Sequence, residues 1–379
     1  MKAGLYPCQM GECDSMPLVS RLVRHLRLSY RARNQERPPT PPFLILFINS
    51  VCNMRCDHCF YWDSLNRKTD LTFEELSALS RSLGPLENLN LSGGEPFLRP
   101  EFAEICAEFI RNNRTRQIFC PTNGYFTEKT ETQLRQVLRL ADLDLFTAEL
   151  SLDGMTGFHD RFRGKPGSFA RILETYDMLV TLQSRDPRLQ IHAITTATAD
   201  NIGEIVQLSE FLYERCPQMS RHNIALLRGE RKRATILGPP AFEYAEAARK
   251  VSHMWAARKD RAAAHLIDPI LHWAKAETRR MNAQVVPCRA GILTAVVYAN
   301  GDVSLCEQQP PLGNLRHQSF LQIWHSPEAI QLRRRIWDNQ CCCTNEIFLW
   351  SSLAFQPVPL LKAVRATGTL SRALRTLAE

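Results

Sequence analysis

The sequence predicts an α/β fold: a partial (β/α)₆ TIM barrel followed by a small C-terminal domain. Six strand-length apolar runs alternate with helical patterns between residues 43 and 235, which is typical of a parallel sheet with helical crossovers. A complete eight-stranded barrel needs about 250 residues, which is more than this stretch provides. From residue 288 onward the chain changes character and carries a second group of cysteines.

Composition places the chain among ordinary globular proteins. Of its 379 residues, 44% are hydrophobic, and 47 basic against 39 acidic residues give a formal charge of +8. No run approaches the roughly 18 apolar residues of a membrane span, and residues 1–17 lack the apolar core of a signal peptide. We therefore expect a cytoplasmic protein, in which the thirteen cysteines remain reduced.

Residues 1–42 are predicted to hold an amphipathic helix and a Pro-rich linker. From Leu18 to about Arg33, apolar residues recur on one helical face, and arginines flank them. We expect this face to dock on the body of the protein; a basic helix lying on a membrane surface is the alternative. The prolines of 37–42 favour a stiff polyproline II linker, so the barrel is expected to begin at residue 43.

The elements of the barrel follow in order. The six predicted strands are Phe43–Asn49, Leu86–Leu91, Gln117–Pro121, Leu145–Leu152, Leu189–Thr195 and Ser220–Leu227. The helices predicted between them are Thr72–Leu83, Glu101–Arg111, Glu128–Leu140, Ser168–Gln183 and Gly203–Glu214. Thr72 and Glu75 fit a capping box, and periodicity places Cys106 and Cys120 in the core.

The rest of the chain divides into three parts. Residues 236–287 are Ala- and Arg-rich and predict a helical connector. Residues 288–348 form the cysteine-bearing domain, where Thr294–Ala299 and Asp302–Leu305 predict a hairpin with a type I′ turn at Asn300-Gly301. The tail, residues 349–379, is apolar and then basic. We expect it to pack on the barrel; membrane contact is the alternative.

The clearest chemical signal is the triad of Cys52, Cys56 and Cys59 directly after the first strand. In a parallel barrel this loop lies at the carboxyl ends of the strands, where active sites are built. Three thiolates can hold three irons of a [4Fe–4S] cluster and leave the fourth iron open. A zinc site closed by His58 is the alternative.

This spacing resembles the signature of the radical S-adenosylmethionine (SAM) superfamily, and three later strand ends support the resemblance. Gly93, Gly94 and Glu95, followed by Pro96, resemble the GGEP motif that binds the methionine amino group of SAM. Asn123 follows the third strand, and Ser151 and Asp153 follow the fourth, as in the family's motifs near SAM. Cys52, Cys56 and Cys59 are then the catalytic cluster ligands.

The resemblance also implies a chemistry and a partner. SAM chelates the open iron, and one electron from a flavodoxin or a ferredoxin cleaves it to a 5′-deoxyadenosyl radical that abstracts hydrogen from an unactivated C–H bond. The protein positions the cofactor and excludes water. Phe60, Tyr61 and Trp62 are expected either to cover the adenine or to pack the loop. His159, Asp160 and Arg163, in an extension of the fourth-strand loop, are candidates for the active-site mouth.

The second cysteine set begins with Cys288 and Cys306, spaced C-x₁₂-G-x₄-C, and continues with the triplet at 341–343. It resembles the SPASM/twitch extension, which binds auxiliary [4Fe–4S] clusters. Only enough cysteines for one cluster are present, so we expect Cys288, Cys306, Cys341 and Cys343 as ligands. Cys342 could replace a neighbour, and structural zinc is an alternative. Cys8, Cys13 and Cys216 are expected to be bystanders.

The expected activity is oxidative modification or cross-linking of a peptide or small molecule. One alternative is a dehydrogenase or epimerase acting on a sugar or another natural-product intermediate. A second is an iron–sulfur scaffold or electron carrier without SAM chemistry. The positive charge raises an RNA-directed enzyme as a third, although we do not expect a nucleic-acid partner.

Overall fold

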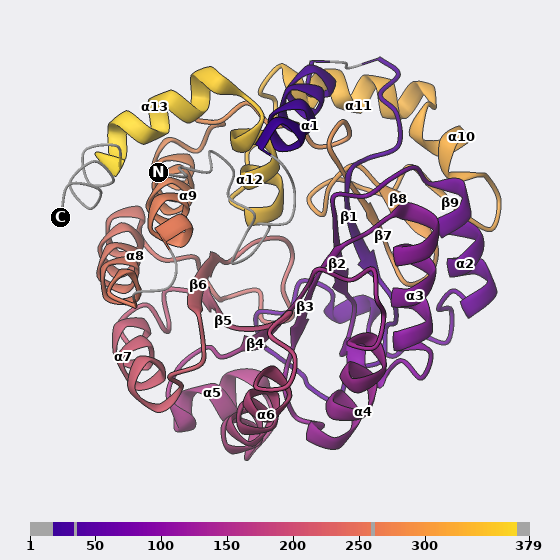
Figure 1. Cartoon of the computed structure of the whole chain (residues 1–379). Coiled ribbons are helices and arrows are strands. Elements are labelled where there is room, and N and C mark those ends of the chain that lie inside the picture. Colours follow the sequence, from indigo (N-terminus) through magenta and orange to yellow (C-terminus); the bar gives the residue numbers. More distant parts are fainter. Residues whose placement is uncertain (1–17, 34–35, 259–261, 370–379) are drawn as a thin grey trace.

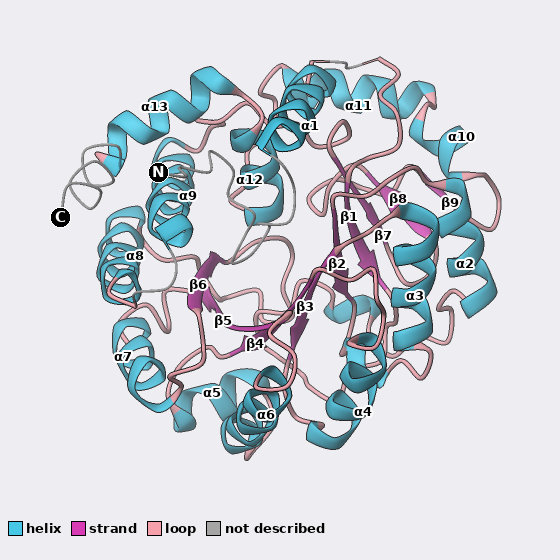
Figure 2. Ribbon diagram, viewed as in Figure 1, coloured by secondary structure: helices cyan, strands magenta, loops and turns pink. Residues whose placement is uncertain are grey.

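The computed structural model describes residues 18–33, 36–258 and 262–369, in which a ring of helices surrounds a mostly parallel sheet that is not closed into a full barrel (Figures 1 and 2). The predicted alternation of strands and helices is confirmed for the barrel. Its six parallel strands are β1 (Phe43–Phe47), β2 (Asn88–Ser92), β3 (Gln117–Thr122), β4 (Leu145–Ser151), β5 (Leu189–Ala197) and β6 (Arg221–Leu226). They are hydrogen-bonded in chain order.

Helices return the chain between these strands and cover the outer face of the sheet. They are α2 (Phe73–Ser82), α3 (Phe102–Asn113), α4 (Thr127–Val137), α5 (Thr156–Arg163), α6 (Ser168–Gln183) and α7 (Ile205–Arg215). The capping box at Thr72 and Glu75 is present. Residues 156–163 form α5, although we expected a loop. The helix ends at Gly164, whose positive φ of 62° suits a left-handed cap.

The C-terminal region extends the same sheet. Strand β7 (Thr294–Val297) pairs in parallel with β1, and β8 (Asp302–Ser304) and β9 (Gly313–Asn314) continue it in antiparallel fashion. The predicted type I′ turn is wrong: Gly301 has a φ of 91°, whereas Asn300 is not among the described residues with positive φ. The Gly301 amide donates to the Tyr298 carbonyl, so a longer loop with one left-handed glycine joins the strands.

Helices from the second half complete the ring. They are α8 (Ala241–Ala256), α9 (Ala262–Met281), α10 (Phe320–Trp324), α11 (Pro327–Trp337), α12 (Glu346–Ala354) and α13 (Pro357–Thr367). The described part of the tail packs against α9 through Leu349, Leu353 and Ala363, as expected. Leu370 and the residues after it lie outside the described chain. No single described helix is long and apolar enough to cross a membrane; α12 and α13 meet those criteria only as a pair, across a 108° bend.

The first helix, α1 (Leu18–Arg31), forms where it was predicted, but its orientation is not the expected one. Val19, Leu22, Val23 and Leu26 are exposed, so the apolar face does not dock on the body. The helix is instead anchored by Leu28 and Ala32, which pack against residues of the C-terminal half.

Candidate functional site

The loop that carries Cys52, Cys56 and Cys59 leaves β1 at the carboxyl end of the sheet, as predicted. The C-terminus of α5 supports it from one side, because the amides of Arg55 and Asp57 donate to the carbonyls of Arg163 and Phe162, at 3.2 and 2.9 Å. These carbonyls end a helix and have no partner within it. The short helix that the sequence analysis missed is therefore the platform of the cysteine loop.

The segment after β6 holds the same loop from another side. The Lys232 amide donates to the Cys59 carbonyl at 3.2 Å, and the Arg233 amide donates to the Asp57 carbonyl at 2.9 Å. The Lys232 Nζ atom also donates to the Arg55 carbonyl at 2.8 Å. The ends of β1, β4 and β6 thus fix one loop, which gives the three thiols a defined position.

The three cysteines are partly buried and interact electrostatically with one another. Burial raises the pKa of Cys52 and of Cys59 to about 12 each, and the neighbouring Cys56 adds to both shifts. Burial also raises the pKa of Cys56, while Arg163 and Lys232 oppose that shift. Free thiols in such a site stay protonated, so a metal centre must supply the positive charge that stabilises thiolates.

Gly93 and Gly94 bring the end of β2 into contact with the cysteine loop. A Cβ atom on Gly93, whose φ is 139°, would lie 2.3 Å from the Asn49 carbonyl oxygen, and one on Gly94 would lie 2.2 Å from that of Val51. The Gly94 and Glu95 amides donate to the same two carbonyls, at 3.0 and 2.7 Å. Only glycine allows the backbones to approach so closely. The two glycines therefore let the end of β2 contact the segment that begins the cysteine loop.

Glu95 is 2% exposed, and its carboxylate accepts three hydrogen bonds at the ends of β2 and β3. The Thr122 hydroxyl and the Phe97 amide donate to Oε1 at 2.8 and 3.3 Å, and the Asn123 amide donates to Oε2 at 2.8 Å. Burial raises the pKa of Glu95 to about 7, although these hydrogen bonds favour the ionised form. A buried carboxylate held in this way suits a cationic ligand.

Asn123 and Ser151 stand at the ends of the next two strands. The Asn123 side chain donates to the Asn53 Oδ1 atom at 2.9 Å, which ties the end of β3 to the cysteine loop. Ser151 ends β4 and is half-buried. The structure therefore brings the predicted residues at the ends of β2, β3 and β4 to the same edge of the sheet as the three thiols.

Asp153 is fully buried, and its partners belong to the protein. Arg163 donates to Oδ2 from Nε at 2.8 Å and from Nη2 at 2.7 Å, and the Thr196 amide donates to Oδ1 at 2.9 Å. The His58 Nε2 atom lies 3.7 Å from Oδ2, and the His58 ring stacks on Phe162 at 4.6 Å. Asp153 therefore holds Arg163, which lies beside the cysteine loop.

The remaining candidates of this region have structural partners. His159 is buried, and its Nδ1 accepts from the Asp153 amide at 3.2 Å. Asp160 accepts from the amides of Gly167 and Phe169, at 2.6 and 2.9 Å, at the start of α6. Both side chains therefore bond within the fold, whereas Arg163 contacts the cysteine loop directly through its carbonyl.

Of the three aromatic residues that follow the triad, two pack inside the protein and one is exposed. Phe60 packs edge-on against Phe47 and lies under the guanidinium of Arg228, 5.0 Å from the ring centre. Tyr61 is buried and stacks on Tyr298 at 6.0 Å. Trp62 is 41% exposed. Phe60 and Tyr61 therefore pack the loop.

Sequence reasoning missed a row of polar side chains inside the barrel. Glu149, His192 and Arg221 are register partners on β4, β5 and β6, so their side chains share the inner face with Ser151, two residues further along β4. Arg221 pairs with Asp268 at 2.5 Å and with Glu346 at 3.2 Å. Polar residues at every second position of β4, β5 and β6 could have indicated that each strand has a polar face. Only the pairing of the strands shows that Glu149, His192 and Arg221 lie side by side.

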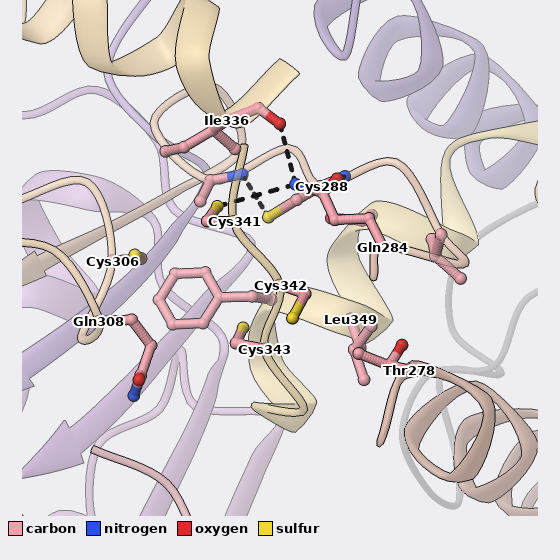
Figure 3. Close-up of a pocket in the computed structure, with 14 residues that line it drawn as sticks. Thr278, Gln284, Cys288, Cys306, Gln308, Ile336, Cys341, Cys342, Cys343 and Leu349 are labelled. Atoms are coloured by element: carbon pink, nitrogen blue, oxygen red, sulfur yellow. Dashed lines mark hydrogen bonds between the residues drawn. The ribbon is translucent and has the colours of Figure 1, made fainter. Parts of the chain in front are cut away.

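The second cysteine set gathers around a pocket that is also lined by residues of α9, α11 and α12 (Figure 3). Cys288, Cys306 and the triplet Cys341–Cys343 line it. The thiols of Cys288, Cys306, Cys341 and Cys343 influence one another electrostatically. Cys342 also raises the pKa of the adjacent Cys341, while its own thiol donates to the Asn282 Oδ1 atom at 3.6 Å. Cys216 is buried in the core, Cys106 and Cys120 are buried as expected, and Cys8 and Cys13 lie outside the described residues.

A polar bridge connects the two cysteine sets. Glu307, next to Cys306, accepts from the Arg228 Nε atom at 3.0 Å and from the Asn345 side chain at 2.6 Å. Arg228 in turn covers Phe60, which follows Cys59. The segments of both sets are therefore fixed to each other by one ion pair.

Both sets fit iron–sulfur clusters in their donor chemistry. Each gathers three or four cysteines that are at least partly buried, and thiolate sulfur is the usual ligand of such clusters. Within the described residues, no group of three or more His, Cys, Asp or Glu side chains is close enough to hold one metal ion.

Comparisons with known proteins agree with this geometry. Residues 46–212 match the radical SAM superfamily, and residues 288–345 match the SPASM family, an iron–sulfur cluster-binding domain. The fold is similar to SuiB of Streptococcus suis (15% identity over 86% of this chain and 74% of that one, TM-score 0.56). It is also similar to SuiB bound to precursor peptide SuiA (14% over 89% and 76%, TM-score 0.55) and to native anSMEcpe with bound AdoMet (15% over 87% and 100%, TM-score 0.58).

Proposed function

Since the chain belongs to the radical SAM superfamily and carries a C-terminal iron–sulfur cluster-binding domain, we propose that it uses SAM to modify a peptide oxidatively or to cross-link it. The observation that carries this proposal is that the end of β2, which bears the buried Glu95 carboxylate, is hydrogen-bonded to the start of the cysteine loop through the Gly94 and Glu95 amides. The precursor peptide bound to SuiB, a protein with a similar fold, supports a peptide as the substrate class.

We propose that Cys52, Cys56 and Cys59 hold the first [4Fe–4S] cluster. A cluster held there would supply the electron for the reductive cleavage of SAM, the chemistry that precedes hydrogen abstraction from a substrate. Arg163 and Lys232 offset the negative charge of the thiolates. Asp153 keeps Arg163 in place through two contacts to its guanidinium, so it acts on the site as a positioning residue.

We propose that the end of β2 binds the methionine part of SAM. Glu95 offers a buried carboxylate to an ammonium group, and its hydrogen bonds from Thr122 and Asn123 fix the carboxylate without consuming all of its lone pairs. Gly93 and Gly94 hold this segment against the cysteine loop. Asn123 and Ser151 would border the same ligand at the ends of β3 and β4.

We propose that Cys288, Cys306, Cys341 and Cys343 hold one auxiliary [4Fe–4S] cluster, which could accept the second electron of an oxidation. Residues 43–235 would form the catalytic domain, 236–287 a connector and 288–348 the auxiliary domain. A flavodoxin or a ferredoxin would supply the first electron. The polar row on β4–β6 would face a substrate inside the barrel.

Reductive SAM cleavage tests the reaction class. The anaerobically reconstituted chain, given SAM and dithionite, should form 5′-deoxyadenosine and methionine in equal amounts. Cys56→Ala should abolish this, whereas Cys106→Ala, which removes a core thiol, should retain it. Intact clusters without 5′-deoxyadenosine would sink the proposal and favour an electron carrier.

The substrate class needs a second measurement. Pooled peptides and pooled sugars, added separately, should differ in how strongly they stimulate 5′-deoxyadenosine formation. A peptide that stimulates it and loses the mass of two hydrogens supports peptide oxidation. Stimulation by sugars alone would favour the dehydrogenase or epimerase alternative.

A further inference from the structure

Helix α1 presents a continuous apolar face that the described protein does not cover. Val19, Leu22, Val23, Leu26 and Tyr30 recur at helical spacing, and their side chains are between 52% and 77% exposed. Residues at this spacing share one side of a helix. Isolated exposed apolar residues are common, whereas an ordered stripe of five indicates a surface that meets another phase or partner.

The opposite side of the helix is the side that attaches it. Leu28 and Ala32 lie across the helix from the stripe and pack with Ile292, Leu293 and Phe355. Arg24 forms an ion pair with Glu87, and Figure 1 shows α1 at the rim of the ring, near α11 and α12. The helix is therefore fixed in the fold with its apolar face outward.

The charge of α1 indicates what kind of surface it meets. Between residues 18 and 31 the sequence has four arginines and no acidic residue. Arg27 borders the stripe and is exposed. Arg24 pairs with Glu87 and Arg31 donates to the Thr40 carbonyl, so Arg27 is the described arginine side chain that an outer surface would meet at the edge of the stripe. An apolar stripe bordered by a cation, on a helix of low overall hydrophobicity, is the composition of helices that lie in the interface of a bilayer.

A second patch of the same character lies on α13. Val358 and Leu361 are 78% and 47% exposed, and Lys362 and Arg365 are exposed on the same helix. The start of α13 lies close to α1, since His25 of α1 contacts Phe355, two residues before α13, at 5.4 Å between ring centres. Anionic lipid would meet cations from both helices.

We propose that the apolar face of α1, together with Val358 and Leu361, docks on the surface of an anionic lipid bilayer. A second copy of the chain is a poorer occupant, because a symmetric dimer apposes the same patch on both subunits and would bring two arginine-rich, acid-free helices together. This inference does not depend on the proposed SAM chemistry.

Co-flotation of the reconstituted full chain with vesicles tests it. We expect binding to phosphatidylcholine vesicles that contain about one third phosphatidylglycerol, weak binding to phosphatidylcholine alone, and release as NaCl rises from about 0.05 to 0.5 M. Leu22→Gln/Leu26→Gln should weaken binding about tenfold or more. The matched control is Leu237→Gln/Phe242→Gln, which removes two exposed apolar side chains before and on α8 and should bind as the parent does.

Three results would overturn the proposal. The first is no flotation with anionic vesicles at low salt. The second is equal loss of binding in the two double variants. The third is a dimer in light scattering that Leu22→Gln/Leu26→Gln converts to a monomer, because the stripe would then be a contact between copies of this chain.

Discussion

Arg163 forms a buried ion pair with Asp153 in which both guanidinium donors, Nε and Nη2, reach the same carboxylate oxygen, at 2.8 and 2.7 Å. The pair lies beneath the cysteine loop, since the Arg163 carbonyl accepts from Arg55 and its charge lowers the pKa of Cys56. Burying charge is favourable only when it is paired. One ion pair therefore serves both the fold and the electrostatics of the proposed cluster.

Arg163→Gln should lower the free energy of unfolding by about 3–5 kcal/mol, because it leaves the Asp153 carboxylate buried without its charge partner. It should also make the reduction potential of the first cluster more negative, because a nearby cation favours the reduced, more negative state. Urea denaturation and a redox titration measure the two effects. Arg116→Gln, on the exposed pair with Asp144, should change stability by less than about 1 kcal/mol. Equal effects in both variants would contradict this account.

Gly94→Ala should prevent the end of β2 from closing on the cysteine loop. The added methyl would lie 2.2 Å from the Val51 carbonyl oxygen, so one segment must move, at a cost of about 1–3 kcal/mol or more. We expect lower iron content and less SAM cleavage. Gly203→Ala is the control, because a Cβ there meets nothing within 4 Å. Normal iron content in the Gly94 variant would show that this approach is not needed.

Glu149 should make stability depend on pH. Burial, reinforced by Glu346, raises the pKa of Glu149 from 4.5 to about 7. Between these values the folded chain holds a proton that the unfolded chain releases, so this contribution to stability is lost as pH rises. The free energy of unfolding of Glu149→Gln, taken relative to the parent, should therefore be higher at pH 8 than at pH 5 by about 1–3 kcal/mol.

Urea denaturation at both pH values measures this difference for Glu149→Gln, with Glu210→Gln as the control on an exposed glutamate. A stability difference of the Glu149 variant that is the same at pH 5 and pH 8 would argue against burial as the cause.

Cys343→Ser should remove the auxiliary cluster, because the Cys343 thiol belongs to the group of four that influence one another. Iron should fall from about eight to about four per chain. Cys342→Ser should leave about eight, since the Cys342 thiol donates to Asn282. The reverse outcome would assign Cys342 as the ligand.

Much of the fold could be predicted because its signals are local. Each barrel strand is an apolar run with helical periodicity on either side, and the capping box at Thr72 and Glu75 lies within four residues. The cysteine triad and the glycines after β2 could be found for the same reason. Residues 156–163 were missed as a helix, because their short polar sequence carries no clear period.

The exposed face of α1 also could not be foreseen. An amphipathic pattern indicates that one side of a helix is apolar. It does not indicate which side packs against the rest of the protein. Leu28 and Ala32 pack in one cluster with Phe355, which lies more than three hundred positions later in the chain. This packing attaches the helix by its smaller apolar face and leaves the larger one outward.

The sequence by itself determined the order of the strands and the two cysteine sets, because periodicity and spacing are properties of neighbouring residues. Only the tertiary structure decided which groups act on those cysteines. Strand pairing aligned Glu149, His192 and Arg221, α5 brought Arg163 beneath the first set, and Glu307 joined β6 to the second. These relationships link residues far apart in the chain, so packing fixes them and no local pattern records them.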